Sequence, residues 1–336
     1  MSALLERVLG GRHLEEAEAS DLIVRLCDES APPALSGALL AGLRAKGETP
    51  EEIRGCASAM RALALRPRIP GGAPLLDIVG TGGDGSGSLN LSTGSALLAA
   101  ACGLKVAKHG NRSVSSRCGS ADVVEALGMR MDLDEASAGA CLARTGFTFL
   151  FAPRFHPAMR AISPVRRALG VRTIFNLLGP VTNPAAPAHL VVGAYSEAAA
   201  ELLAHTLAGM EVERAYVVHG AGGWDEATPI GPFTLHDARP GRVVTEVRDP
   251  AAYGVPSCAP ADLAGAGPRE NAESLRHALG GEPGAHRDAL VLGAALALQV
   301  TGRVGPPRDA AEAAAAAIDD GRAARLLEAL VETSHP

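Results

Sequence analysis

A glycine-rich segment between a predicted strand and a predicted helix constrains this chain more than any other feature. An apolar β-type run over residues 75–79 leads into five glycines between Gly80 and Gly87, and a small-residue helix is expected over residues 94–101. Glycine has no Cβ, so successive backbone N–H groups can curl around an anion. Ser92 and Thr93 lie where the helix begins, and a helix N-terminus favours negative charge. The segment therefore predicts a phosphate or pyrophosphate cradle, with an ordinary turn as the alternative.

Two well-known phosphate loops fit this segment poorly. A Walker loop needs Lys and a hydroxyl residue after its last glycine, whereas Gly85 is followed by Ser86 and Gly87. Residues 80–85 do spell G-x-G-x-x-G, but a dinucleotide fold requires an acidic residue after the next strand. The next β-type run, residues 104–107, is followed instead by a basic stretch at residues 108–112. The sequence thus indicates a different kind of anion site.

Composition places this site on a globular, acidic protein. The 336 residues allow roughly two domains, and 47% are hydrophobic. A net charge of −6 argues against a nucleic-acid partner. The six cysteines form no C-x-x-C pair, which favours reduced thiols in a cytosolic protein. With no signal-like N-terminus and no apolar run of membrane-spanning length, we expect a cytoplasmic location and no membrane partner.

The order of apolar patterns predicts an α/β fold with two domains. Helical spacing over residues 1–66 predicts a small N-terminal helical domain, residues 1–68, which helices around residues 160–185 would complete. Strand and helix patterns alternate from residue 75 onward, so residues 73–336 should form a larger α/β domain around a central mixed or parallel sheet. Two short strands are expected over residues 233–247, and helices over residues 288–301 and 309–333.

Three polar clusters each follow an apolar run, at residues 80–93, 108–122 and 219–228. Ligands of α/β sheets bind at the carboxyl ends of strands, so the clusters should meet in one site. Asp225 and Glu226 follow a glycine-rich turn and could hold Mg²⁺ through oxygen ligands, although the first turn of a helix is the alternative. Ser120 is a candidate N-cap, and arginines between residues 154 and 172 could clamp a carboxylate.

Taken together, the motifs resemble the anthranilate phosphoribosyltransferase family of tryptophan biosynthesis. The matching stretches run through most of the chain, at residues 80–84, 90–93, 108–116, 119–122, 156–159, 172–184 and 225–226. The resemblance implies a small helical domain and a larger α/β domain with the active site between them. It also implies a homodimer, formed through the helical domain. Such an enzyme transfers the phosphoribosyl group of 5-phosphoribosyl 1-pyrophosphate (PRPP) to the amine of anthranilate, with one or two Mg²⁺ ions.

The resemblance also assigns roles to individual residues of this sequence. Those implied for PRPP are Gly80, Gly83, Asp84, Ser88, Asn90, Leu91, Ser92, Thr93, Lys108, His109, Gly110, Asn111, Arg112, Ser113, Val114, Ser115, Ser116 and Ser120. Those implied for anthranilate are Gly80, His109, Asn111, Arg166 and Pro180. The implied Mg²⁺ ligands are Ser92, Asp225 and Glu226, and the residues expected to act in catalysis are Lys108 and Arg166.

The sequence departs from the family pattern at two places. Ser88-Leu89 replaces the common Thr-Phe, and Trp224 precedes Asp225 where Leu is usual. Neither change removes a charge that the chemistry needs. Two other functions stay open at this point: a pyrimidine nucleoside phosphorylase, which shares the architecture, and a non-catalytic relative that binds nucleic acid.

Overall fold

The computed structural model describes residues 1–69, 71–113 and 117–335. Val114, Ser115 and Ser116, which the family resemblance assigns to PRPP, therefore lie outside the described residues. In the described part, seven strands form one sheet in the order β3-β2-β1-β4-β5-β6-β7. Their bounds are β1 (Leu75–Gly80), β2 (Lys105–Gly110), β3 (Phe147–Phe151), β4 (His189–Gly193), β5 (Arg214–His219), β6 (Phe233–Arg239) and β7 (Arg242–Arg248).

The helices precede, alternate with and follow these strands. The α-helices are α1 (Ser2–Leu9), α2 (Glu16–Leu26), α3 (Pro33–Lys46), α4 (Pro50–Ala62), α5 (Leu91–Ala101), α6 (Ser120–Ala126), α7 (Glu135–Thr145), α8 (Ala152–Phe155), α9 (Met159–Leu169), α10 (Phe175–Leu178), α11 (Glu197–Ala208), α12 (Pro268–Leu279), α13 (Ala285–Val300), α14 (Pro307–Asp319) and α15 (Arg322–Ser334). Short 3-10 turns are η1 (Gly179–Val181), η2 (Ala221–Gly223), η3 (Pro250–Tyr253) and η4 (Pro260–Leu263).

The sheet is mixed, as expected. Strands β1 to β5 are parallel, whereas β6 and β7 pair antiparallel with β5 and with each other. Because β1 pairs with β2 on one side and β4 on the other, the strand order reverses at β1. A reversal of this kind leaves a crevice at the carboxyl ends of the strands, where ligands of α/β proteins bind.

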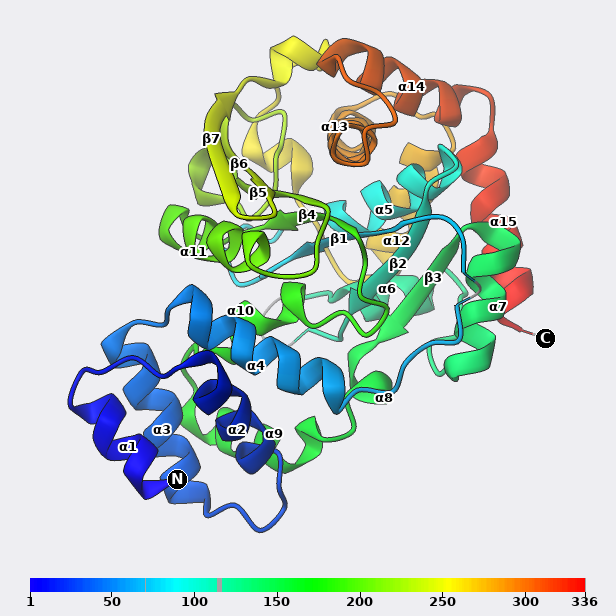
Figure 1. Ribbon diagram of the computed structural model, residues 1–336. Helices are drawn as coiled ribbons and strands as arrows, with labels where there is room; N and C mark the ends of the chain where they lie inside the picture. The colour runs from blue at the N-terminus through cyan, green and yellow to red at the C-terminus, as the bar shows by residue number, and fades with distance from the viewer. Residues whose placement is uncertain (70, 114–116, 336) are drawn as a thin grey trace.

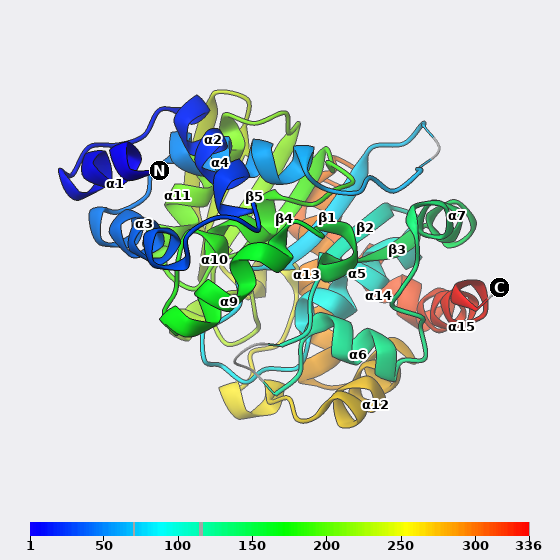
Figure 2. The ribbon, with the colours of Figure 1, turned by 90° about the horizontal axis from the view of Figure 1, so that it is seen from below.

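Each face of the sheet packs against its own set of helices. Side chains alternate across β4, so Leu190 and Val192 face one hydrophobic core while Val191 faces the other. Helices α5 and α12 to α15 cover one face, and α11 with the helical domain covers the other (Figure 1). Seen from below, helices α1 to α3 gather at one side of the molecule, opposite α7 and α15 (Figure 2).

The helical domain is built from two separate parts of the chain. Ile162 of α9 and Phe175 of α10 share one core with residues of α2, α3 and α4. Helix α4 begins with a capping box: Thr49 accepts the Glu52 N–H at 3.3 Å, and Pro50 follows at the first helical position. In Figure 1, α10 lies between α4 and the sheet, whereas α9 packs beside α3 within the helical domain.

The C-terminal region differs from the sequence expectation in one respect. The helix expected over residues 309–333 is two helices, α14 and α15, separated at Gly321. Gly321 has φ +79°, a left-handed conformation that glycine adopts readily and that ends a helix. The expected strands over residues 233–247 are confirmed as β6 and β7. In the described part of the chain, no helix is both long and apolar enough to cross a membrane.

Candidate active site

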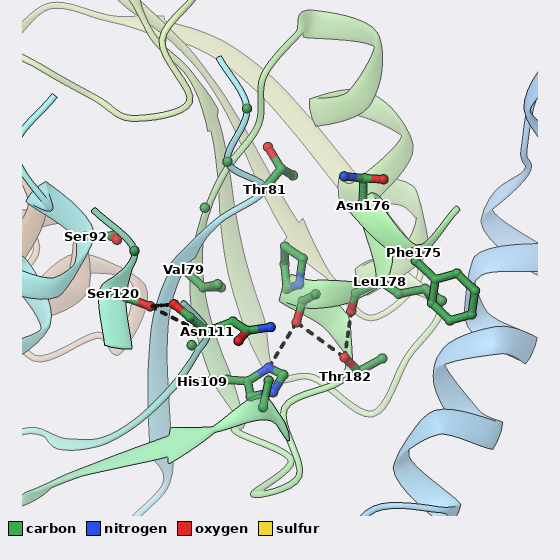
Figure 3. A pocket seen from close by; sticks show the side chains of 18 of the residues that line it. Val79, Thr81, Ser92, His109, Asn111, Ser120, Phe175, Asn176, Leu178 and Thr182 are labelled. Carbon is green, nitrogen blue, oxygen red and sulfur yellow. Dashed lines mark hydrogen bonds between the residues drawn. The ribbon is translucent and has the colours of Figure 1, made fainter. Parts of the chain in front are cut away.

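A cleft of about 780 Å³ lies between the carboxyl ends of the strands and the boundary segment formed by α9, α10 and η1. The loops after β1, β2 and β5 all reach it, so the three polar clusters of the sequence do meet in one place. Figure 3 shows the same arrangement, with Ser92 and Ser120 on one side of the cleft and Phe175 and Asn176 on the other.

The glycine-rich loop after β1 is held in an open, curled shape. Gly82, Gly83, Gly85 and Gly87 all have positive φ, a backbone conformation that residues with a Cβ rarely adopt. Backbone hydrogen bonds fix the far end of the loop, because Gly87 accepts the Gly265 N–H at 2.8 Å. The Arg172 guanidinium donates to the Gly83 carbonyl and stacks on a tyrosine ring. The loop therefore arches over the cleft with its backbone positioned from both sides.

Three carboxylates meet beneath this loop. Asp225 accepts the Gly82 N–H at 2.6 Å, and its own N–H donates to Asp84 at 3.2 Å. Glu226 accepts the Ser92 N–H at 2.8 Å, at the start of α5. Residues 224–228 form no helix, so the alternative of a helix first turn for Asp225 and Glu226 is wrong. The polypeptide here serves to bring acidic side chains to the glycine loop.

The surroundings of these carboxylates disfavour their ionised forms. Burial, and then repulsion from Asp84, raise the pKa of Asp225 to about 7. Burial and the neighbouring Asp225 raise the pKa of Glu226 well above its ordinary value. A divalent cation would relieve this repulsion, so the donor set fits Mg²⁺. Within the described residues, however, no group of three His, Cys, Asp or Glu side chains is arranged to hold a metal. Substrate phosphate would have to complete the ligand shell, as is usual for Mg²⁺.

Lys108 is the cation nearest to this acidic group. Its side chain is 1% exposed, and Nζ donates to the Ile78 carbonyl at 2.5 Å and to Ser92 Oγ at 3.4 Å. Burial lowers the pKa of Lys108, while Asp77 and Glu226 oppose that shift. The Lys108 side chain thus joins the end of β1 to the start of α5 at the floor of the cleft.

Two buried histidines form the wall behind the cleft. His109 Nδ1 lies 3.2 Å from the Gly179 carbonyl, and because a carbonyl only accepts, the ring proton is placed on Nδ1 (Figure 3). The ring packs against His156 with a centroid separation of 5.1 Å. Burial lowers the pKa of His109 to about 3 and that of His156 to about 4, so both rings are neutral at pH 7.

The opposite side of the cleft carries arginine and apolar side chains from the boundary segment. The Arg166 guanidinium stacks on the Phe175 ring at 4.8 Å from its centroid. Burial lowers the pKa of Arg166, and neither a hydrogen bond nor an ion pair to another described residue engages its guanidinium. Pro180, buried in η1, lines the same cleft. This half of the cleft offers a planar cation beside apolar surface, which suits an aromatic carboxylate.

Most of the residues expected from the sequence lie in this one cleft. Those that line it are Gly80, Gly83, Asp84, Ser88, Asn90, Ser92, Lys108, His109, Gly110, Asn111, Ser120, Arg166, Pro180, Asp225 and Glu226. Those that do not line it are Leu91, Thr93, Arg112 and Ser113. Arg112 instead pairs with Asp122 and Glu125, each at 2.8 Å. Ser120 is the first residue of α6 and its N-cap is Gly119, so the N-cap expectation is wrong. The Ser120 hydroxyl bonds the Asn111 backbone instead.

Sequence reasoning missed some of the lining residues. They are Met60 of α4 and Ser163 of α9. Met159, Asn176 and Thr182 also line the cleft; they lie in stretches that the family resemblance covers, but no role was assigned to them. Only tertiary packing brings Met60 to the cleft, and no local pattern around it indicates a site. Thr182 hydrogen-bonds the Leu178 carbonyl at 2.8 Å and so has a structural role that its sequence context does not reveal.

Comparisons with known proteins agree with this architecture. Residues 2–64 match the helical bundle domain of a glycosyl transferase family, and residues 72–324 match the a/b domain of that family. The anthranilate phosphoribosyltransferase of Desulforudis audaxviator is 47% identical over 98% of this chain and 94% of its own length. The crystal structure of the Thermus thermophilus anthranilate phosphoribosyltransferase superposes with a TM-score of 0.92 at 41% identity, covering 99% of both chains.

The yeast anthranilate phosphoribosyltransferase is a more distant relative, 28% identical, covering 99% of this chain and 97% of its own. Its structures were solved in complex with PRPP and Mg, with a TM-score of 0.89, and with 4-fluoroanthranilate, with a TM-score of 0.87. The 47% identity to the Desulforudis audaxviator relative, over nearly the whole length and both domains, shows more than a shared fold. The chain belongs to the anthranilate phosphoribosyltransferase family.

Proposed function

We propose that this protein transfers the phosphoribosyl group of PRPP to the amine of anthranilate, giving N-(5-phosphoribosyl)anthranilate and pyrophosphate. One observation carries the proposal: a curled glycine loop over three carboxylates shares a single cleft with an arginine that stacks on an aromatic ring. The first half suits a metal-bound pyrophosphate, and the second suits an aromatic acid. The yeast relative binds PRPP, Mg and 4-fluoroanthranilate, which supports the same pairing here.

On the donor side, the loop after β1 and the start of α5 would bind the phosphates. Gly80, Gly83 and Asn90 present backbone and amide groups to the cleft, with Ser88 and Ser92 as hydroxyl donors. Asp225 and Glu226, with Ser92, would hold Mg²⁺, which when bound neutralises charge on the pyrophosphate. Asp84 would act mainly on the loop, because it accepts the Ser86 N–H at 3.1 Å and the Asp225 N–H.

On the acceptor side, Arg166 would bind the anthranilate carboxylate. Asn111 and Gly80 would contact the ring and its amine, and Pro180 and His109 would line its path. The neutral His109 ring suits a site for an uncharged amine, since a charged imidazolium there would repel developing positive charge. A guanidinium held by a stacked ring is also positioned for a planar, two-point contact with a carboxylate.

The reaction then needs little acid–base chemistry from the chain. The anthranilate nitrogen supplies the electron pair of the new C1–N bond, the C1–O bond to pyrophosphate breaks, and its pair leaves on pyrophosphate. The nitrogen then loses one proton, which passes to the released pyrophosphate or to water. Lys108, when protonated, would stabilise the negative charge that develops on the leaving group. Positioning both substrates in one cleft would supply most of the remaining rate enhancement.

Two further features of the family belong to the proposal. A homodimer through the helical domain is supported by two exposed apolar side chains there, Leu9 at 65% and Val24 at 49% exposure. A cytoplasmic location is supported by the absence of a disulfide between any two cysteines of the described chain. The number of bound Mg²⁺ ions, one or two, is left to direct titration.

Product analysis tests the proposal against its alternatives. Incubation with anthranilate, PRPP and Mg²⁺ should yield N-(5-phosphoribosyl)anthranilate and pyrophosphate, both detected by mass spectrometry. A pyrimidine nucleoside phosphorylase would instead release free base from uridine in the presence of phosphate. A nucleic-acid-binding relative would form no product and would shift DNA in a salt-sensitive manner. Either of these results would overturn the proposal.

A further inference from the structure

A carboxylate lies where the central strand of the sheet would be expected to be apolar. Asp77 is the third residue of β1, is 0% exposed, and is flanked by the buried side chains of Leu76 and Ile78. Burial raises the pKa of Asp77 to about 6, although Lys108 and Asn183 favour its ionised form. A buried carboxylate is costly unless several donors satisfy it, so its presence in a core strand requires a reason.

Asp77 lies where β1 and β2 separate. The pairing between these strands covers Leu75 with Lys105 and Leu76 with Val106 and goes no further, whereas β1 stays paired with β4 as far as Gly80. Beyond that point, side chains bridge the two strands. Asp77 Oδ1 accepts the His109 N–H at 3.3 Å, and Lys108 Nζ donates to the Ile78 carbonyl. The opening of the sheet at the floor of the cleft is therefore held by these two charged residues.

The second oxygen of the same carboxylate reaches the boundary segment. Asn183 Nδ2 donates to Asp77 Oδ2 at 2.7 Å and to the Ala107 carbonyl at 2.8 Å, and Asn183 is itself 0% exposed. Asn183 follows η1, whose Gly179 carbonyl holds His109 Nδ1 (Figure 3). The Asp77 carboxylate thus holds two parts of the site at once. One oxygen binds the backbone N–H of His109, and the other binds Asn183, just after the η1 segment against which the His109 ring packs.

We propose that Asp77 is a positioning residue for the anthranilate half of the site, acting through Asn183 and the His109 backbone. This inference rests on the proposed function. Asp77 does not line the cleft, so its effect on substrate is indirect. Its removal would let His109 and the η1 segment move apart while leaving the glycine loop and the acidic group in place, because those are held by separate contacts.

Asp77→Asn tests this directly. Both oxygens of the Asp77 carboxylate accept hydrogen bonds from N–H groups. In the variant, the amide N–H would face one of these donors, so that one of the two hydrogen bonds would be lost. We expect the anthranilate KM to rise about tenfold or more, while the equilibrium Kd for Mg²⁺-bound PRPP, measured by calorimetry, stays within about twofold. A purely structural role would lower Tm and the active fraction while leaving both constants of the folded enzyme unchanged.

Asn183→Ala and the double variant complete the cycle. If Asp77 acts through Asn183, the rise in anthranilate KM of the double variant should not exceed the larger single effect. The inference would be overturned if the effects of the two single substitutions on the anthranilate KM multiplied in the double variant, or if Asp77→Asn left the anthranilate KM unchanged. Should Asp77→Asn fail to fold, Asn183→Ala alone decides, by the same two constants. Thr148→Val, a buried polar change on β3, which pairs with β2 and not with β1, is the matched control and should change neither constant. Absence of wild-type turnover would refute the proposed function instead.

Discussion

Arg166 is the residue on which recognition of the acceptor depends most. It stacks on Phe175 and engages no carboxylate of the described chain. A charge-assisted hydrogen bond contributes about 1.5–3 kcal/mol. Arg166→Ala should therefore raise the anthranilate KM about tenfold or more and leave the PRPP KM within about twofold. Steady-state kinetics with each substrate varied in turn checks this. Arg144→Ala, an exposed arginine of α7 that does not line the cleft, is the control, and equal losses for both substrates would contradict the assignment.

His109 links the site to the pH dependence of stability. Its pKa is about 3 in the folded protein and about 6.5 in an unfolded chain, so only the unfolded chain takes up a proton between these values. Stability from this residue is therefore present above pH 6.5 and is lost as pH falls, by about 2 kcal/mol at pH 5. In urea unfolding at pH 7 and pH 5, His109→Gln should reduce the pH-dependent loss by about that amount. An unaltered difference would contradict the burial argument. The exposed His205→Gln is the control.

The sequence predicts the place of a residue in the site where the pattern around that residue is informative, and it fails where the side chain binds a partner elsewhere in the chain. The loop glycines, Ser92, Asp225 and Glu226 could be placed together because each follows a predicted strand. Arg112 shows the opposite case. Its charge and its position in a basic stretch indicate an anion site, but Asp122 and Glu125 of α6 neutralise it. Asp77 was hidden in an apolar run, since nothing local reveals that Asn183 lies against it.

At the scale of elements, the close approach of β4 to the loop that carries Asp225 and Glu226 is the contact most sensitive to substitution. A Cβ on Gly193 would lie 1.5 Å from the Asp225 carbonyl oxygen, a backbone atom that cannot turn away. Gly193→Ala should therefore displace the loop, lower the free energy of unfolding by about 3 kcal/mol, and reduce Mg²⁺-dependent turnover. Thermal unfolding and activity assays check both effects. Gly305→Ala, whose Cβ would meet nothing within 4 Å, should be neutral. Wild-type behaviour of Gly193→Ala would contradict the packing.

Element types were largely predictable from periodicity and breakers. The alternation of patterns after residue 75 indicated the α/β domain, and the family comparison and the observed sheet confirm it. The order of strands was not predictable, because pairing of β1 with both β2 and β4 depends on long-range contacts. The split between α14 and α15 depends on a single glycine in a run that otherwise favours one helix.

For the whole molecule, the helical domain is the proposed dimer surface. Analytical ultracentrifugation should give twice the mass of one chain. Leu9→Glu with Val24→Glu places charges on exposed apolar positions of α1 and α2 and should yield monomers. Val247→Glu, at an equally exposed apolar position on the edge strand β7, is the control and should leave the dimer intact. Dissociation by Val247→Glu alone would place the interface on the sheet edge instead.

The central claim is that one cleft joins a Mg²⁺-dependent donor site to an anthranilate site. Anthranilate fluorescence, followed after mixing with PRPP, Mg²⁺ and the protein, tests it most directly. We predict a fall that requires Mg²⁺ and that is abolished by Asp225→Asn combined with Glu226→Gln, because the pair supplies the acidic oxygens beneath the glycine loop. No fall with folded protein and bound PRPP, or an undiminished fall in the double variant, would contradict the account.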